Sequence, residues 1–192
     1  MTPIHTLFGA TILAGASLLA GCSNDTQPAA DTTEVAAPQQ PATGTPPMTL
    51  TAMLKTADGM DAGTATATER DDGIAITVTA TNMTAGERGI HVHTTGKCEG
   101  PKFESAGGHW NPTGAQHGLS NPQGQHHGDM PNLTVPSDGS GKLDYVIRDA
   151  QIAEMQDADG AALVIHAKFD DQMTDPSGNS GDRIACGVFT RG

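Results

Sequence analysis

The chain has 192 residues and a formal net charge of −12 with histidine counted as neutral, from 22 acidic residues against 10 lysines and arginines. This acidic balance argues against nucleic-acid binding, which requires a basic face. Only 3% of the residues are aromatic, whereas 24 are glycine, a composition that favours short strands and many turns.

The first 47 residues are predicted to be an export signal followed by a tether. Residues 7–20 are apolar or small and are too few to span a bilayer, which is typical of a secretory signal. Leu19-Ala20-Gly21-Cys22 resembles the lipobox of bacterial lipoproteins, and this implies cleavage before Cys22 and a lipid on its sulfur. We therefore expect a lipoprotein signal peptide over 1–21, a disordered tether from lipidated Cys22 over 22–47, and one folded domain over 48–192.

Eight strands are predicted along this domain, because short apolar or alternating runs recur between turn signals. They cover residues 49–54, 63–69, 74–79, 89–93, 133–135, 143–147, 162–166 and 183–189. The turn at 137–141 predicts a hairpin between the fifth and sixth strands, and residues 151–157 are expected to form one helical turn. Two long segments without periodicity, 94–131 and 170–182, are expected to be functional loops. The pattern favours an antiparallel sandwich or barrel.

Two cysteines remain in the predicted domain, Cys98 and Cys186. An even pair in an exported domain predicts a disulfide by default. The bond would close a loop of almost ninety residues, which the loop-entropy model values at about 4 kcal/mol. It would also hold the first long loop against the last strand.

Histidines are concentrated in one part of the domain. Six of the eight in the chain lie between 89 and 132, and His166 ends a later predicted strand. Neutral imidazole is the commonest metal ligand, so a metal centre is the first hypothesis. His91 and His93 are two apart on a predicted strand and share a face, so both can bind one ion.

The other candidate ligands lie in the first long loop. They are His109, His117, Asp129 and either His126 or its neighbour His127. Three histidines and one aspartate suit tetrahedral zinc, whereas an all-imidazole set drawn from strands suits copper equally well. Ligand type therefore indicates two metal sites without naming the metals.

Six sequence fragments follow one another along the domain. They are Gly-Ile-His91-Val-His93-x-x-Gly-x-Cys98, Gly-Gly-His109-x-Asn-Pro, His117-Gly, His126-x-Gly-Asp129, Leu-Val-Ile-His166 and Arg183-Ile-Ala-Cys186-Gly-Val. Their order and spacing resemble the copper/zinc superoxide dismutase family in its exported bacterial form, over nearly all of 48–192. The resemblance implies an all-β fold, an eight-stranded, sandwich-like Greek-key β-barrel with two long functional loops.

The resemblance also implies a role for each candidate residue. Copper would be bound by His91, His93, His109 and His166, and zinc by His109, His117, His126 and Asp129. His109 would bridge the two ions, and the family spacing favours His126 over His127.

Catalytic roles fall to His109 and to Arg183, which would attract and orient superoxide. Asp170 would hydrogen-bond His91 and His117 from outside the two ligand sets, with the adjacent Asp171 as its alternative. The family disulfide matches Cys98 and Cys186.

The implied enzyme is an oxidoreductase, a superoxide dismutase that converts superoxide to oxygen and hydrogen peroxide by copper redox cycling, with zinc in a structural, bridged site. The implied location is the periplasm, with a lipid anchor at Cys22, and a homodimer is compatible with the resemblance. Ser23 rather than aspartate after the lipid cysteine favours the outer membrane over the inner one. The alternative is a non-catalytic lipoprotein that buffers copper or zinc on the same fold. Residues 172–182 contain no lysine, so attraction of superoxide rests on Arg183 and on Lys97, Lys102 or Lys168.

Overall fold

The computed structural model describes residues 46–192, and the predicted signal peptide, Cys22 and almost all of the predicted tether lie outside this range. Within it the elements are β1 (Thr49–Thr56), β2 (Asp61–Arg70), β3 (Gly73–Ala80), β4 (Gly86–Arg88), β5 (Ile90–His93), η1 (Glu104–Ala106), β6 (Leu133–Val135), β7 (Gly141–Arg148), α1 (Ile152–Met155), β8 (Ala162–His166), β9 (Arg183–Val188) and β10 (Thr190–Arg191). No helix in these residues is long and apolar enough to cross a membrane. All eight predicted strands are present, and so is the single helical turn.

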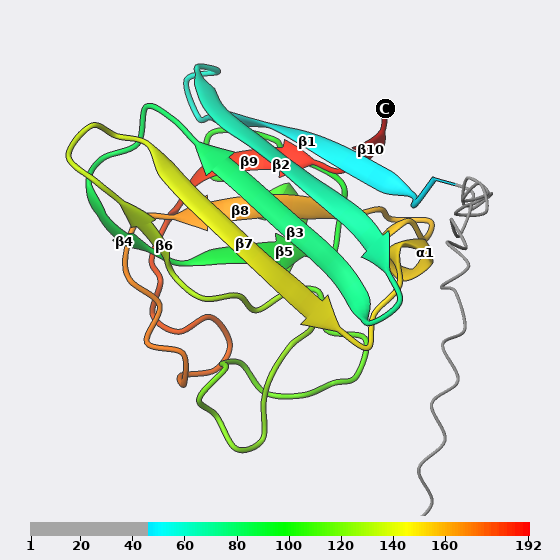
Figure 1. Ribbon diagram of the computed structural model, residues 1–192. Coiled ribbons are helices and arrows are strands. Elements are labelled where there is room, and N and C mark those ends of the chain that lie inside the picture. The colour runs from blue at the N-terminus through cyan, green and yellow to red at the C-terminus, as the bar shows by residue number, and fades with distance from the viewer. Residues whose placement is uncertain (1–45) are drawn as a thin grey trace, which may run out of the picture. The chain divides into compact units, whose positions relative to one another are not determined.

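The main sheet is antiparallel and curled, in the order β5-β8-β9-β1-β2-β3-β7, with β10 beside β1. Figure 1 shows β1, β2, β3 and β7 as one layer, with β5, β8 and β9 behind it. The chain therefore crosses between layers after β3, between β5 and β7, and again after β7, which is the pattern of a Greek key. β6 packs beside β7, and β4 leads into β5, so the separate β4–β6 ladder joins the two ends of the curled sheet. The predicted all-β class is confirmed.

The predicted hairpin between 133–135 and 143–147 is wrong, because β6 pairs with β4 and not with β7. β7 pairs instead with β3 along its whole length, from Gly73↔Arg148 to Ala80↔Gly141. All three residues of β6 pair with β4, from Gly86↔Val135 to Arg88↔Leu133, and β6 lies beside β7 without a ladder between them. β4, which no prediction covers, has no buried residue and no apolar alternation.

The core lies between the two layers and follows the two-residue period of the strands. Ile90 and Val92 of β5 belong to it, as do Leu163 and Ile165 of β8. The alternate residues of both strands lie on the outer face, yet they are also buried, because the loop that follows β5 packs over that face. The outer face of β5 and β8 is therefore also buried in the protein, and histidine side chains line it.

Candidate metal centre

Three candidate ligands lie on the outer face of β5 and β8. His91 and His93 are alternate residues of β5, and His166 ends the neighbouring β8. A register shift after Ile165 places His166 opposite Arg183 at the start of β9. The pairing of three adjacent strands therefore brings these side chains to one region.

Loop 94–132 reaches the same face through backbone pairing with β5. Asp129 forms an antiparallel bridge with His91, and His109 forms one with His93. Between these bridges, both backbone polar groups of Val92 are hydrogen-bonded to the loop. The loop therefore runs across β5 much as another strand would, which fixes the height of its ligand residues above the sheet.

The first cluster consists of four histidines, each with a buried ring nitrogen that has no hydrogen-bond partner. The nitrogens are Nδ1 of His91 and Nε2 of His93, His109 and His166. One nitrogen from each of the four residues lies within 4.8 Å of the others. Leaving a buried polar atom unpaired costs about 1–3 kcal/mol, so four such atoms that converge form the donor set of a metal ion.

Hydrogen bonds at the second ring nitrogen fix the orientation of three of these imidazoles. His91 Nε2 bonds to Asp170 Oδ2 at 2.6 Å, and His93 Nδ1 bonds to the carbonyl oxygen of Gly107 at 2.9 Å. His166 Nδ1 bonds to the carbonyl oxygen of Gly181 at 3.2 Å. Each bond places the proton on the outer nitrogen, so the lone pair of the inner one faces the cluster.

The second cluster centres on Asp129. Its Oδ1 lies 2.9 Å from Nδ1 of His109, 2.9 Å from Nδ1 of His117 and 3.3 Å from Nδ1 of His126. Its Oδ2 accepts hydrogen bonds from the backbone N–H groups of Gly118 and His126. Three imidazoles and one carboxylate that meet at one point suit tetrahedral zinc. His109 presents Nδ1 here and Nε2 to the first cluster, so it lies between the two.

His126 rather than His127 completes the second cluster. His127 lies outside it and packs edge-on against Trp110, with ring centroids 5.2 Å apart. In the set of donor atoms that all lie within 4.8 Å of one another, His91 rather than His126 stands beside His109, His117 and Asp129. Because its Nε2 is bonded to Asp170 and its Nδ1 faces the first cluster, His91 is not counted among the ligands here.

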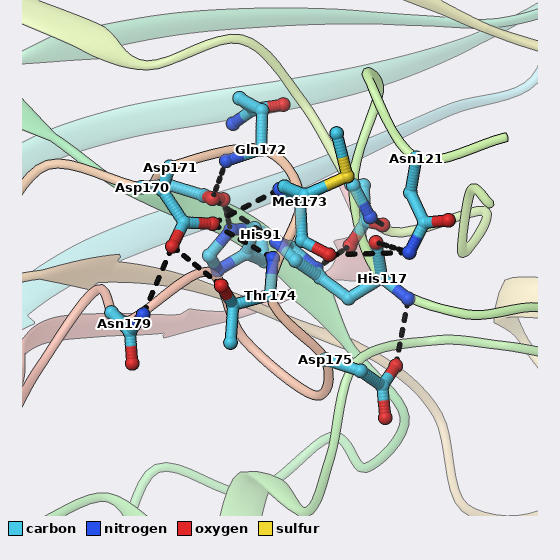
Figure 2. A network of polar contacts seen from close by, with 12 residues as sticks. His91, His117, Asn121, Asp170, Asp171, Gln172, Met173, Thr174, Asp175 and Asn179 are labelled. Carbon is cyan, nitrogen blue, oxygen red and sulfur yellow. Dashed lines mark hydrogen bonds and ion pairs between the residues drawn. The ribbon is translucent and has the colours of Figure 1, made fainter. Parts of the chain in front are cut away.

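Asp170 connects the two clusters from outside. Besides the bond from His91, its carboxylate accepts one from His117 Nε2 at 3.0 Å, and it is completely buried (Figure 2). Asp171 does not substitute for it, because its carboxylate accepts hydrogen bonds within its own loop. Gly178 has a φ of +61° beside Asp170, and a Cβ there would lie 1.7 Å from Oδ1, so only glycine leaves room for this carboxylate.

Burial keeps the strand histidines neutral. It lowers the pKa of His91 to about 3 and that of His166 to about 4, and it holds the pKa of His93 well below its ordinary range. For His117, hydrogen bonds to Asp129 and Asp170 outweigh burial and raise the pKa to about 9. Although burial opposes them, the hydrogen bonds from histidines hold the pKa of both carboxyl groups well below the usual range.

The metal-free protein is expected to lose stability as the pH falls from about 6.5 to about 4. In this window the unfolded chain protonates His91 and His166, whereas the folded chain keeps them neutral. Proton linkage lowers the free energy of unfolding by about 1.4 kcal/mol per pH unit for each such histidine. His117 has the opposite sign: its contribution is complete below pH 6.5 and is lost as the pH rises through about 9.

Urea unfolding of the chelator-treated chain at about pH 7, 5.5 and 4.5 measures this slope. The variant His127→Ala changes a residue outside both clusters and should keep the same slope of unfolding free energy against pH. The variant His166→Ala should reduce this slope by the contribution of one histidine. A free energy of unfolding that stays constant between pH 6.5 and 4 would contradict the neutral state of these side chains.

Arg183 is held at the edge of the first cluster by backbone carbonyls. Its Nη1 donates to the carbonyl oxygen of Phe103 at 2.7 Å and its Nη2 to that of Gly107 at 2.6 Å. A cavity of about 480 Å³ is lined by Arg183 together with His93, His109 and His166. The guanidinium therefore lies where a small anion would approach the unpaired nitrogens.

The disulfide between Cys98 and Cys186 is confirmed, with Cα atoms 5.7 Å apart. The disulfide anchors the segment that contains Phe103 and Gly107, whose carbonyl oxygens accept the hydrogen bonds from Arg183. Sequence reasoning did not find these carbonyls, because any residue supplies a backbone oxygen and no pattern marks it. Of the predicted site residues, Cys22, the predicted lipidation site, lies outside the described range.

An all-β domain in which two buried histidine clusters share one imidazole defines a two-metal protein. The family model described as copper/zinc superoxide dismutase (SODC) matches residues 61–189. The chain belongs to the copper/zinc superoxide dismutase family, which implies copper and zinc as its metals and superoxide dismutase as its enzyme class. The predicted family and its barrel fold are confirmed.

Several relatives are similar to this chain. Superoxide dismutase-like protein YojM of Bacillus subtilis (strain 168) is 42% identical over 127 residues, which cover 62% of this chain and 64% of that protein. Copper–zinc superoxide dismutase 2 of Aquifex aeolicus (strain VF5) is 38% identical over 144 residues, which cover 72% and 84%. The chain thus spans somewhat under two thirds of the length of the first of these relatives.

Solved structures share the fold. A double mutant of a SOD-like protein from Bacillus subtilis, with two substitutions to histidine, has a TM-score of 0.69 at 41% identity, covering 72% of this chain and 95% of that one. The Cu/Zn superoxide dismutase from Brucella abortus has a TM-score of 0.61 at 30% identity, covering 73% and 98%.

Proposed function

We propose that this protein is a copper/zinc superoxide dismutase that converts two superoxide anions and two protons to oxygen and hydrogen peroxide. The observation that carries the proposal is the convergence of four buried, unpartnered histidine nitrogens beside Arg183. A purely structural cluster would pair these nitrogens, since a buried unpaired polar atom is costly. The second cluster shares His109 with the first, as a bridged pair of metals requires.

We propose His91, His93, His109 and His166 as copper ligands and His109, His117, His126 and Asp129 as zinc ligands. Copper, when bound, supplies the one-electron redox chemistry, and zinc holds the second cluster together. Asp170 orients His91 and His117 through its two carboxylate oxygens. The donor types and burial fit both ions.

Two residues act on the substrate in this proposal. The guanidinium of Arg183 attracts superoxide and donates hydrogen bonds to it within the cavity. His109 Nε2 is the buried, unpartnered nitrogen that this residue presents to the first cluster, and it can hold a proton and deliver it to the departing peroxide while Nδ1 stays with the second cluster. The buried rings on either side exclude bulk water from this nitrogen.

We further propose that the protein works in the bacterial envelope, anchored through Cys22 to the outer membrane. Leu19-Ala20-Gly21-Cys22 supports the lipid anchor. The disulfide supports a compartment outside the reducing cytoplasm, because such bonds persist in oxidising surroundings.

The test is superoxide removal by the full chain after loading with copper and zinc, beside a double variant with His91→Ala and His93→Ala. We expect rapid turnover in the parent chain and a loss of at least about a thousandfold in the variant, because two of four ligands of the redox metal are gone. Tight binding of both metals by the parent without turnover would contradict the enzyme. That result would favour metal buffering as the function instead. The name of one relative, superoxide dismutase-like protein, is compatible with this alternative.

A further inference from the structure

The cavity at the first cluster contains an acidic side chain opposite in charge to Arg183. It belongs to Asp175, in the loop between β8 and β9. Among the residues that line this cavity, Asp175 is the only acid and Arg183 the only lysine or arginine. The side chain of Asp175 is 51% exposed, so its charge is not buried in the loop.

Asp175 is fixed by the loop that carries the second cluster. Its Oδ1 accepts a hydrogen bond from the backbone N–H of His117 at 2.7 Å, the bond drawn at the lower right of Figure 2. The same oxygen lies 3.7 Å from Nε2 of His126.

The rest of the loop is also held on both sides of Asp175. The carboxylate of Asp171 accepts from the backbone N–H and the hydroxyl of Thr174 and from Nδ2 of Asn179 (Figure 2). Asn121 of the other loop donates to the carbonyl oxygen of Met173 at 3.1 Å. Asp175 is therefore a charge held in place and not a mobile surface side chain.

We propose that Asp175 is an electrostatic residue of the copper cavity, whose fixed negative charge weakens the binding of small anions there. This inference rests on the proposed function, in which the cavity holds copper and admits superoxide. A fixed negative charge repels every small anion in the cavity, whereas Arg183 stabilises only an anion that reaches its guanidinium. In a chain with a net charge of −12, Asp175 is the one acid among the residues that line this cavity, whereas the charge of Glu104 acts on Arg183 from outside it.

The experiment is a titration of the copper- and zinc-loaded full chain with azide, followed by the absorption spectrum of Cu(II). Asp175→Asn keeps an oxygen to accept from His117 and removes the charge, so it should tighten azide binding by about three- to tenfold. Asp58→Asn is the matched control, because it makes the same change in net charge in the exposed turn between β1 and β2. It should leave the azide Kd within about twofold of the parent.

A second measurement separates charge from structure. Zinc loss to a chelator should be unchanged in Asp175→Asn and faster in Asp175→Ala, which lacks the acceptor for His117. An azide Kd in Asp175→Asn equal to that of the parent overturns the proposal, and so does a shift that Asp58→Asn reproduces. Azide binding needs no superoxide turnover, so a copper-loaded but inactive chain would contradict the proposed function and still test Asp175.

Discussion

Replacing Cys98 and Cys186 with alanine is expected to lower the free energy of unfolding by about 4 to 5 kcal/mol, the loop-entropy value for cysteines separated by 88 residues. The disulfide joins loop 94–132 to β9, and Cys186 packs in a small apolar cluster with Phe103 and Ala106. The loss therefore combines a looser unfolded state with a less ordered loop. Urea unfolding of the chelator-treated chain, oxidised and reduced, measures it.

The same change should also lower turnover, although neither cysteine is among the proposed ligands. Arg183 donates to the carbonyl oxygens of Phe103 and Gly107, and both belong to the segment that Cys98 anchors. Once the segment is released, the guanidinium is no longer fixed beside the first cluster. The double variant and the reduced parent should behave alike. A loss of stability below about 1 kcal/mol would show that the loop is held by its backbone pairing with β5 instead.

The strands were predictable because their burial follows a local pattern. Thr49–Thr56 and Gly73–Ala80 alternate between core and surface, and the apolar run of Ala162–His166 indicates a strand buried on both faces. The placing of His91 and His93 on one face followed from the same two-residue period. Both features depend only on residues that lie close together in the sequence, so the sequence alone is enough to predict them.

Strand partners were not predictable in the same way. β7 pairs with β3 and β6 pairs with β4, and both partners lie much earlier in the chain, outside any local window of the sequence. The position of loop 94–132 likewise depends on bridges to β5 formed by Asp129 and His109. The order and spacing of the ligand residues indicated the metal sites, but the physical path that brings the loop to the sheet is visible only in the fold.

Asp175 illustrates what remains hidden even when a family is recognised. Its residue type is unremarkable in a chain with 22 acidic residues, and its significance comes from the cavity it shares with Arg183. Asp170 is the opposite case, because its spacing after His166 marked it, and the structure then brings it to both clusters. The difference is that a spacing can be read along the chain and a shared cavity cannot.

Asp170→Asn is expected to weaken the binding of zinc and copper by about 10- to 100-fold, as loss of the group that orients metal ligands does elsewhere. The carboxylate accepts hydrogen bonds from His91, from His117 and from the backbone N–H of Gln172. An amide has one acceptor oxygen, and its NH₂ group would face an N–H of one of the two imidazoles. Either His91 or His117 then loses its orientation, and the cluster to which it belongs loses a ligand.

The metal-free form of Asp170→Asn should also be less stable than the parent by about 2 to 4 kcal/mol, because a buried imidazole N–H is left unpaired. Asp171→Asn is the matched control: it makes the same substitution one residue later, where the carboxylate serves only its own loop. Zinc competition with a chelator and urea unfolding measure the two effects. If Asp170→Asn and Asp171→Asn bound zinc equally well, the link between the two clusters would be dispensable, and orientation of the ligands would have to come from loop packing alone.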